Sequence, residues 1–207
     1  MTEIIRLPEN LVNKIAAGEV VERPASVVKE LVENSLDAGA SRIRIEIDEG
    51  GIKKIKVTDD GQGIGNDFLP LALTRHATSK LTSADQLDSI ASLGFRGEAL
   101  PSIASVSMFE IVSKPRDQLA GYNLKIEGGR EIRRSEAGAP DGTTIEVREL
   151  FFNTPARRKF LKTQVTETRH VIDVINGLAL AFPGCGFELA SEGRNILDLN
   201  RSDSRAE

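Results

Sequence analysis

Two clusters of polar residues contain the side chains of this chain that are best suited to chemistry. The first holds Glu30, Asn34 and Asp37, and the second runs from Asp59 to Gly63. A carboxylate can act as a general base, an amide oxygen suits Mg²⁺, and an acid at a strand end can read a nucleobase. Together they indicate a nucleotide site. On spacing alone, however, the first cluster is more typical of a solvated helix face, and the second is equally typical of an ordinary Asp-Gly turn.

The sequence around these clusters predicts a helix followed by a β-hairpin. Ser26 is a candidate N-cap for a helix over residues 26–37, and Gly39 is a natural C′ residue for it. Strict alternation of apolar and polar residues over 42–48, and again over 52–58, predicts two half-buried strands. Their short connection predicts an antiparallel pair, so the acid of the second cluster stands at a strand end.

The rest of the chain predicts further strands and helices around one long polar loop. The loop runs from Arg75 to Gly94, a length that is typical of a functional lid or of a disordered segment. Pro101 fits the first turn of a helix that follows Gly97. Periodicity predicts helices near 11–18, 68–73 and 167–182, and strands near 108–113, 122–127, 143–149, 187–190 and 196–199.

Composition bounds the class of protein. The 207 residues are 40% hydrophobic, which is enough for one domain with a real core. A net charge of −4 is not typical of a protein that coats a polyanion, although it leaves room for a local basic patch. The single cysteine, Cys185, excludes an internal disulfide and is typical of a small buried residue. The sequence shows no signal peptide and no membrane-spanning run, so we expect a soluble cytoplasmic domain.

Several familiar site motifs are absent from the sequence. It has no P-loop, no H-E-x-x-H and no C-x-x-C, and the glycine spacing over 61–65 is not that of a Rossmann turn. Its two histidines, His76 and His170, are too few for a histidine metal cage and are typical of loop or surface positions. The chemistry therefore has to come from the carboxylates, the amide and the glycine loops.

Four short motifs follow one another along the chain: Glu30…Asn34…Asp37-Ala38, Asp59-x-Gly61-x-Gly63, Gly94-x-x-Gly97 and Gly142-Thr143. Their order resembles that of the GHKL ATPases, a superfamily that includes gyrase B, Hsp90 and the sensor histidine kinases. Three longer strings, at 17–24, 94–100 and 153–160, are similar to the MutL-type DNA mismatch repair proteins of that superfamily. The resemblance covers nearly the whole chain.

The resemblance implies a fold of the α+β class. It would be a Bergerat-type two-layer α/β sandwich, in which helices cover one face of a mixed, largely antiparallel sheet. Residues 1–200 would form this ATPase domain, with an N-terminal arm over 1–19 and an ATP lid over about 75–94. Residues 201–207 would begin a linker to a transducer domain that this chain lacks.

The resemblance also implies a function. The reaction would be Mg-dependent hydrolysis of ATP to ADP and phosphate, weak in this shortened form. ATP would order the lid and the arm and so pair two protomers, and the homodimer would engage DNA, MutS and other repair proteins. One alternative is an ATP-gated interaction module without significant hydrolysis, and a gyrase-like or chaperone-like ATPase is the nearest enzyme alternative. A sensor kinase would need an adjoining helical segment with a phosphorylated histidine, which this sequence does not show.

By the same resemblance, the first two motifs have assigned roles. Glu30 would be the general base that polarises the attacking water, and Asn34 would hold Mg²⁺. Asp37 would be a supporting residue, although it is equally typical of a polar helix end. Asp59 would accept a hydrogen bond from the exocyclic amine of adenine, where guanine presents a carbonyl. Small residues after that acid would let the backbone approach the nucleotide.

The later motifs would hold the phosphates. A helix start with free N–H groups favours phosphate oxygens. The candidate residues in the lid, Thr78, Ser79 and Lys80, are equally typical of a solvated loop, and Arg96 and Glu98 are equally typical of an ion pair. The last-motif threonine would hydrogen-bond near Asp59 and the base. The remaining candidate binding residues are Gly61, Gly63, Thr78, Ser79, Lys80, Gly94, Phe95, Arg96, Gly97, Glu98, Ala99, Leu100 and Thr143.

Two residues depart from the usual pattern of the family, and one basic cluster stands apart. Asp60 replaces a common asparagine and would add negative charge near the ligand, and Pro101 replaces a common alanine and would only stiffen a helix start. The cluster holds Arg157, Arg158, Lys159 and Lys162. It is typical either of a surface that faces DNA or of a solvated helix start.

Overall fold

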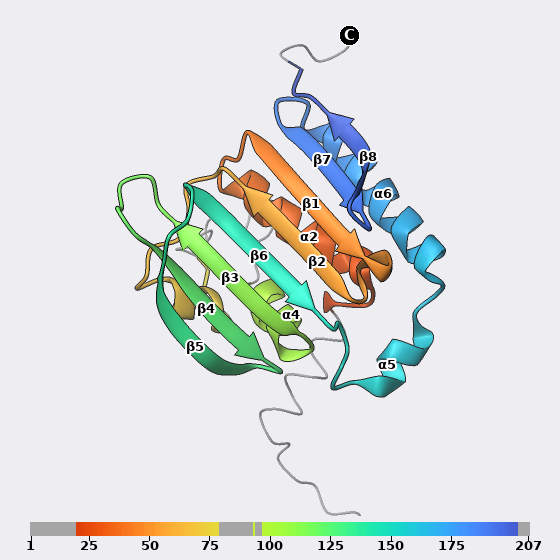
Figure 1. The fold of residues 1–207 in the computed structure, drawn as a ribbon, viewed down its shortest axis with the longest axis horizontal. Coiled ribbons are helices and arrows are strands. Elements are labelled where there is room, and N and C mark those ends of the chain that lie inside the picture. The colour runs from red at the N-terminus through yellow and green to blue at the C-terminus, as the bar shows by residue number, and fades with distance from the viewer. Residues whose placement is uncertain (1–19, 79–92, 94–96, 203–207) are drawn as a thin grey trace, which may run out of the picture.

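The computed structural model describes residues 20–78, Leu93 and residues 97–202. The helix predicted near 11–18, the N-terminal arm over 1–19, most of the lid and the end of the 201–207 linker lie outside the described residues. For the described ranges, one sheet with helices packed on it accounts for the architecture (Figure 1).

Eight strands form this sheet in the order β5-β4-β3-β6-β2-β1-β7-β8. Neighbouring strands are antiparallel throughout, except that β1 and β7 run parallel. The prediction of a mixed, largely antiparallel sheet is therefore confirmed. The strands are β1 (Arg42–Asp48), β2 (Lys54–Asp59), β3 (Met108–Lys114), β4 (Gly121–Glu127), β5 (Arg130–Ala137), β6 (Gly142–Arg148), β7 (Gly186–Ser191) and β8 (Arg194–Leu199).

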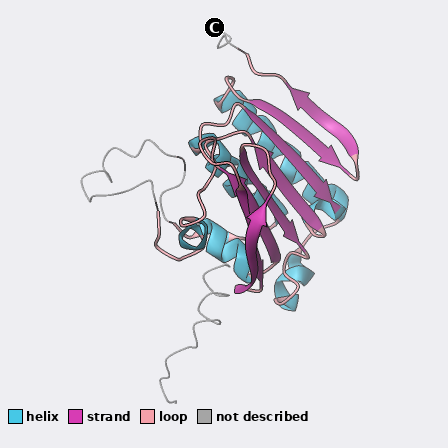
Figure 2. Cartoon of the chain, turned by 60° about the vertical axis from the view of Figure 1, so that its left-hand side comes forward, coloured by secondary structure: helices cyan, strands magenta, loops and turns pink. Residues whose placement is uncertain are grey.

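The main helices lie together on one face of the sheet, which makes two layers. Figure 1 shows α2, α4 and α6 behind the strands, and Figure 2 shows helices and strands of the described residues as separate layers. The predicted sandwich with helices on one face is confirmed. The helices are α2 (Pro24–Asp37), α3 (Leu69–Ala72), α4 (Ala99–Ser105), α5 (Pro155–Phe160) and α6 (Gln164–Ala181), with a short 3-10 turn, η1 (Glu49–Gly51), between β1 and β2.

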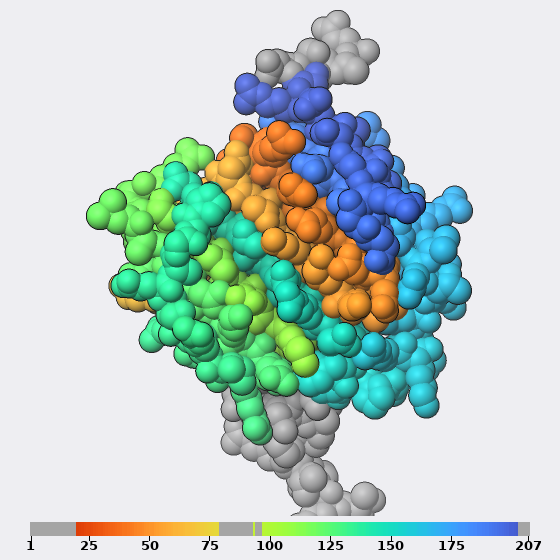
Figure 3. Space-filling model, in the orientation of Figure 1, coloured from red at the N-terminus to blue at the C-terminus, as the bar shows by residue number. Residues whose placement is uncertain are grey.

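Alternation along the strands sorts the side chains between the two faces. In β1 the isoleucines at 43, 45 and 47 are buried under the helices. The charged residues between them lie on the open face seen in Figure 3, where Lys54 Nζ lies 2.9 Å from Asp48 Oδ2 and Lys125 Nζ lies 3.1 Å from Glu110 Oε2. Partly exposed pairs of this kind contribute about 0–1 kcal/mol each, so the apolar face supplies most of the stabilisation of the sheet.

The start of α2 differs from the prediction. The helix begins at Pro24 with Arg23 as its N-cap, so Ser26 lies inside the first turn and is not the cap. Proline favours this position because its fixed φ suits a helix and its missing N–H would have had no intrahelical partner. The predicted N-cap Ser26 is therefore wrong, because the proline two residues earlier sets the start of the helix.

The end of α2 agrees with the prediction. Gly39 has a φ of 71° and donates its N–H to the carbonyl of Leu36, while Ala40 donates to Ser35. This pair of bonds is the Schellman motif, in which a left-handed residue closes the last helical turn. It turns the chain directly into β1.

Two elements escaped the sequence analysis. Strand β5 is an edge strand whose residues are mostly exposed, so its sequence lacks an apolar alternation to detect. Helix α5 has no buried residue among its six and begins at Pro155. β5 pairs only with β4, which precedes it across a short turn, so exposure and not distance in the chain hid it.

The left-handed end of α2 supports a stability prediction with a matched control. A Cβ at Gly39 meets no atom within 4 Å, so Gly39→Ala should cost only backbone strain, about 1–2 kcal/mol of unfolding free energy. Gly177 also has open space but lies inside α6, so Gly177→Ala should stabilise the protein by up to about 1 kcal/mol. Urea denaturation measures both. Equal effects of the two substitutions would contradict the assigned conformation of Gly39.

Candidate nucleotide-binding site

The carboxylate of Asp59 is the centre of a buried polar cluster at the end of β2. Its Oδ2 accepts a hydrogen bond from Ser35 Oγ at 2.8 Å. Its Oδ1 accepts from the backbone N–H groups of Gly61, at 2.9 Å, and Thr143, at 3.2 Å. Only 9% of Asp59 is exposed. Three separate segments, namely α2, the glycine loop and β6, therefore meet at one acid.

Burial has an electrostatic consequence for this acid. It raises the pKa of the Asp59 carboxyl above its ordinary value, although the hydrogen bonds from Gly61, Ser35 and Thr143 act in the opposite direction. The charged form is thus costly here, and the three donors offset only part of that cost. A charged group in this state gains from any further donor that reaches it.

Thr143 lies beside Asp59 through the pairing of β6 with β2. The register places the two residues opposite one another, and the expected contact between them is the hydrogen bond from the Thr143 N–H. On its other side the Thr143 hydroxyl lies 2.8 Å from the hydroxyl of Ser113 on β3. The polar cluster therefore continues across a third strand.

The two glycines after Asp59 are required by protein contacts. A Cβ on Gly61 would lie 2.9 Å from the Cβ of Ala38, and one on Gly63 would lie 2.4 Å from the carbonyl oxygen of Lys114. Gly142 has even less space beside it, because an added Cβ would lie 2.1 Å from the carbonyl oxygen of Asp59. In the family pattern, Gly61 and Gly63 would let the backbone approach a ligand. The structure adds a reason within the protein, since the loop and the start of β6 pass very close to their neighbours.

Helix α2 contacts the segment that precedes α4 through Asp37. Asp37 Oδ1 accepts a hydrogen bond of 3.1 Å from the N–H of Leu93, so Asp37 holds nearby backbone. Glu30 and Asn34 are half-buried on the same stripe of α2 as Asp37, and Ser35 next to Asn34 contacts Asp59. The second motif thus contacts α2 through Ser35, the residue next to Asn34 of the first motif.

The described ends of the predicted lid lie against the start of α4. A Cβ on Gly97, whose φ is 60°, would lie 2.5 Å from the carbonyl oxygen of Ala77. His76 Nδ1 lies 3.3 Å from Glu98 Oε1. Residues 76–77 and 97–98 are therefore in contact, and Glu98, for which a binding role and an ion pair with Arg96 were both open, lies beside a histidine.

The remaining predicted phosphate-binding residues divide into two groups. Ala99 and Leu100 open α4, with Pro101 in its first turn as expected, and exposed Thr78 lies just before the undescribed part of the lid. Five others lie outside the described residues: Ser79, Lys80, Gly94, Phe95 and Arg96.

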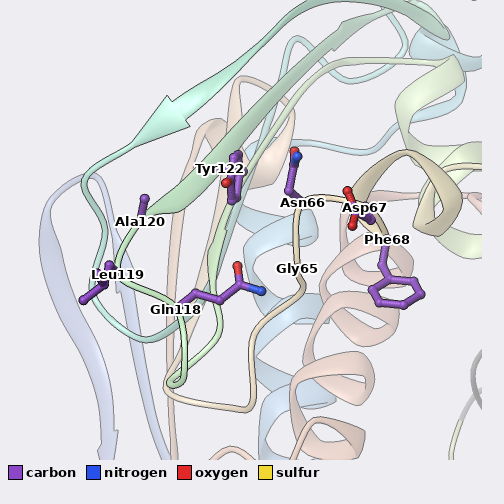
Figure 4. Close-up of a pocket in the computed structure, with 8 residues that line it drawn as sticks. All are labelled: Gly65, Asn66, Asp67, Phe68, Gln118, Leu119, Ala120 and Tyr122. Carbon is purple, nitrogen blue, oxygen red and sulfur yellow. The ribbon is translucent and has the colours of Figure 1, made fainter.

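A hollow on the surface of the described part lies beside the glycine loop. It has a volume of about 450 Å³ and opens between residues 65–68 and residues 118–122 (Figure 4). None of the residues predicted to bind nucleotide lines it. The polar cluster around Asp59 is therefore distinct from this hollow.

Asp60 is turned toward the start of β1. Its Oδ1 accepts hydrogen bonds from the N–H groups of Ser41, at 2.7 Å, and Arg42, at 2.9 Å, and its Oδ2 accepts from the Ser41 hydroxyl. Partial burial would raise the pKa of Asp60, but these hydrogen bonds outweigh it and the pKa lies below its ordinary value. The acid at this position thus serves to hold β1, a use that the sequence analysis did not foresee.

Part of the basic cluster is used within the protein. Arg157 donates to the carbonyl oxygen of Val21 at 3.4 Å, and Arg158 lies 3.4 Å from the carboxylate of Glu149. Lys159 and Lys162 are exposed. Cys185 is buried, as its sequence context predicted, and burial raises the pKa of its thiol to about 11.

Two serines of the polar cluster were missed by the sequence analysis. Ser35 follows Asn34 directly and faces the sheet, while Ser113 is a polar residue at a buried position of β3. The only signal in the sequence was a serine among apolar residues on a face predicted to be buried. Such a signal identifies no partner until the strands are paired.

Among the described residues, no group of three or more acids, histidines or cysteines could hold a metal by itself. By itself, Asn34 offers a single hard oxygen. Such a ligand suits Mg²⁺ only where phosphate oxygens and waters complete the coordination shell of the ion. No helix in the described part of the chain combines the length and apolarity that a bilayer crossing requires.

Comparison with known proteins identifies the family. The model of the histidine kinase-, DNA gyrase B- and HSP90-like ATPases matches residues 22–148, which include Asp59, its glycine loop and Thr143. The chain belongs to this ATPase family.

Within this family the chain is similar to MutL over most of its length. It is 56% identical over 191 residues to the DNA mismatch repair protein MutL of Xanthomonas oryzae pv. oryzae, covering 92% of this chain and 31% of that protein. It is 55% identical over 196 residues to MutL of Streptococcus sanguinis, covering 95% of this chain and 30% of that protein. The chain therefore spans about a third of the length of these curated relatives.

A solved ATPase-family structure has the same fold. The Aquifex aeolicus MutL ATPase domain complexed with ADP has a TM-score of 0.71 and 39% sequence identity, covering 90% of this chain and 66% of that one. The Bergerat-type arrangement inferred from the motifs is thus the fold of this chain, and that relative binds ADP.

The opposite pKa shifts of Asp59 and Asp60 predict opposite pH dependences. The raised pKa of Asp59 means that its contribution to stability is fully present below the ordinary value of 3.8 and is lost as pH rises through the folded-state pKa. Asp59→Asn should therefore become more stable relative to the unchanged protein as pH rises toward neutrality.

Asp60→Asn is the matched control. The lowered pKa of Asp60 gives stability that is present above 3.8 and is lost as pH falls through the folded-state pKa. This variant should be destabilised at neutral pH, with a difference that shrinks in acid. Urea denaturation as a function of pH measures both, and parallel trends in the two variants would contradict the assignment.

Proposed function

We propose that this chain binds ATP and hydrolyses it slowly, as the ATPase part of a MutL-type DNA mismatch repair protein. The observation that carries the proposal is the buried Asp59 carboxylate, held by α2, the glycine loop and β6 beside the helix that bears Glu30 and Asn34. The similarity to MutL and the ADP complex of a relative support it.

Asp59 has the properties needed to select adenine. It is an acceptor whose position is fixed by three hydrogen bonds, and its charge is costly enough that a further donor is favourable. The exocyclic amine of adenine supplies such a donor. Guanine would place a carbonyl oxygen against the carboxylate, so two acceptors would face each other.

Glu30 and Asn34 are proposed to serve the reaction from the neighbouring helix. Glu30 would accept a proton from the attacking water, and Asn34 would give one oxygen to a Mg²⁺ whose other ligands are phosphates and waters. The metal supplies charge neutralisation for the phosphates. Asp37 would hold the backbone at Leu93 next to them.

The phosphates would lie against the segment from Gly94 to Leu100. Gly97 and the N-cap Glu98 lie beside residues 76–77, and Ala99 and Leu100 begin α4, so phosphate oxygens would find backbone N–H groups there. Thr78, Ser79, Lys80, Gly94, Phe95 and Arg96 stay predictions for the same site, as does the lid over about 75–94.

The switch attributed to ATP is also a proposal. ATP would order the lid and the arm over 1–19 and so favour a homodimer, which would engage DNA, MutS and other repair proteins. The division into an ATPase domain over 1–200 and a linker over 201–207 belongs to the same proposal. The relatives are bacterial proteins, whose DNA lies in the cytoplasm, which supports a cytoplasmic location.

Base selection by Asp59 can be measured by calorimetry with non-hydrolysable ATP and GTP analogues and Mg²⁺. The unchanged chain should prefer the ATP analogue, and Asp59→Asn should weaken its binding by about 10- to 100-fold, because a hydrogen bond to a charged acceptor is lost. Asp60→Asn, which alters the neighbouring acid, should keep the preference. Equal affinity of the unchanged chain for the two analogues would refute the assignment of Asp59.

The general base can be tested on the same helix. Glu30→Ala should reduce turnover by about 10²–10⁴-fold while sparing ATP binding. Glu33→Ala is the control, since Glu33 pairs with Lys29 at 2.7 Å and has no assigned role. Phosphate release measures turnover, and calorimetry measures binding. Unaltered turnover in Glu30→Ala would exclude Glu30 as the base, and binding without turnover in the unchanged chain would favour the ATP-gated module.

A further inference from the structure

Ser113 is a fully buried residue of β3 that connects two parts of the candidate base site. Its hydroxyl oxygen accepts a hydrogen bond from the N–H of Ile64 at 2.7 Å. The same oxygen lies 2.8 Å from the hydroxyl of Thr143 and 3.2 Å from the carbonyl oxygen of Gly142. One side chain thus contacts the end of the glycine loop and the start of β6.

The donors and acceptors of this hydroxyl leave only two arrangements. A serine hydroxyl has one hydrogen and two acceptor positions, and the N–H of Ile64 takes one acceptor. If Ser113 donates to Gly142, then Thr143 donates to Ser113 and has only acceptor capacity left. If Ser113 donates to Thr143, then the hydrogen of Thr143 is free for another partner. Ser113 therefore determines what Thr143 offers to a ligand.

The position of Thr143 matters because of its other contact. Its backbone N–H donates to Asp59 Oδ1 at 3.2 Å, so Thr143 lies between Ser113 and the acid. Gly142 leaves β6 little freedom on this side, since even a Cβ there would lie 2.1 Å from the carbonyl oxygen of Asp59. A shift of Thr143 would thus alter both its own hydroxyl and one of the donors that hold Asp59.

We propose that Ser113 is a positioning residue for base selection. It fixes the glycine loop to β6 and sets the orientation of the Thr143 hydroxyl, and through Thr143 it holds the Asp59 carboxylate in the place from which adenine is preferred to guanine. This inference rests on the proposed nucleotide-binding function. It adds a residue that acts through Thr143 and Asp59 and does not itself touch the base.

The test compares two buried serines of the 207-residue chain. Ser113→Ala removes the shared hydroxyl, whereas Ser107→Ala removes one that only donates to the carbonyl of Ile103 at 2.7 Å. Calorimetry with ADP and GDP gives the ratio of their affinities. Ser113→Ala should reduce this ratio by about tenfold, the effect of one unsatisfied buried group, and Ser107→Ala should leave it unchanged.

Two further variants complete the design. Ser113→Thr keeps the hydroxyl and should restore the ratio toward that of the unchanged chain, which a loss of packing alone would not explain. Ser113→Cys fills the same space with a weak hydrogen-bonding group and should behave like Ser113→Ala. It carries the test if circular dichroism shows that Ser113→Ala does not fold.

The outcomes separate this inference from the proposed function. The role of Ser113 would be overturned, with ATP binding left intact, if Ser113→Ala had the same ratio of ADP to GDP affinity as Ser107→Ala. Where the alanine variant is unfolded, the same comparison applies to Ser113→Cys. An unchanged chain that binds ADP and GDP equally would overturn the proposed function, and the role of Ser113 with it.

Discussion

The carboxylate of Asp59 is a charge held inside the protein by three hydrogen bonds. Removing a charge from water is costly unless donors replace the lost solvation. Here the donors come from Ser35 on α2, Gly61 in the glycine loop and Thr143 on β6. No one of these segments can move far without leaving the acid short of a partner, so much of the local architecture follows from this one requirement.

The sheet makes that convergence possible. β2 pairs with β1 on one side and β6 on the other, and the second pairing sets Thr143 opposite Asp59. β3 then pairs with β6 and brings Ser113 opposite Thr143. Antiparallel register therefore joins residues that lie as far apart as 59 and 143 in the chain into a single polar cluster, while α2 closes it from the helical layer.

Tight backbone contacts and polar contacts both hold the segments around Asp59 in place. Gly61, Gly63 and Gly142 lie where any side chain would meet neighbouring atoms, so the loop and the start of β6 are confined by sterics as well as by hydrogen bonds. At the other side of α2, Asp37 holds Leu93, and the start of α4 contacts residues 76–77. A site arranged in advance in this way reduces the ordering that a bound nucleotide would otherwise require.

The sequence by itself determined the β1–β2 hairpin, the Schellman end of α2 at Gly39 and the family, because local periodicity, turn chemistry and ordered motifs are written along neighbouring residues. It did not reveal β5 and α5, because their exposed residues carry no apolar periodicity. It also did not reveal the roles of Ser35, Ser113 and Asp60, which depend on which strands pair, in which register, and on what lies beside each polar group. Such contacts join distant residues, so only the tertiary structure decided them.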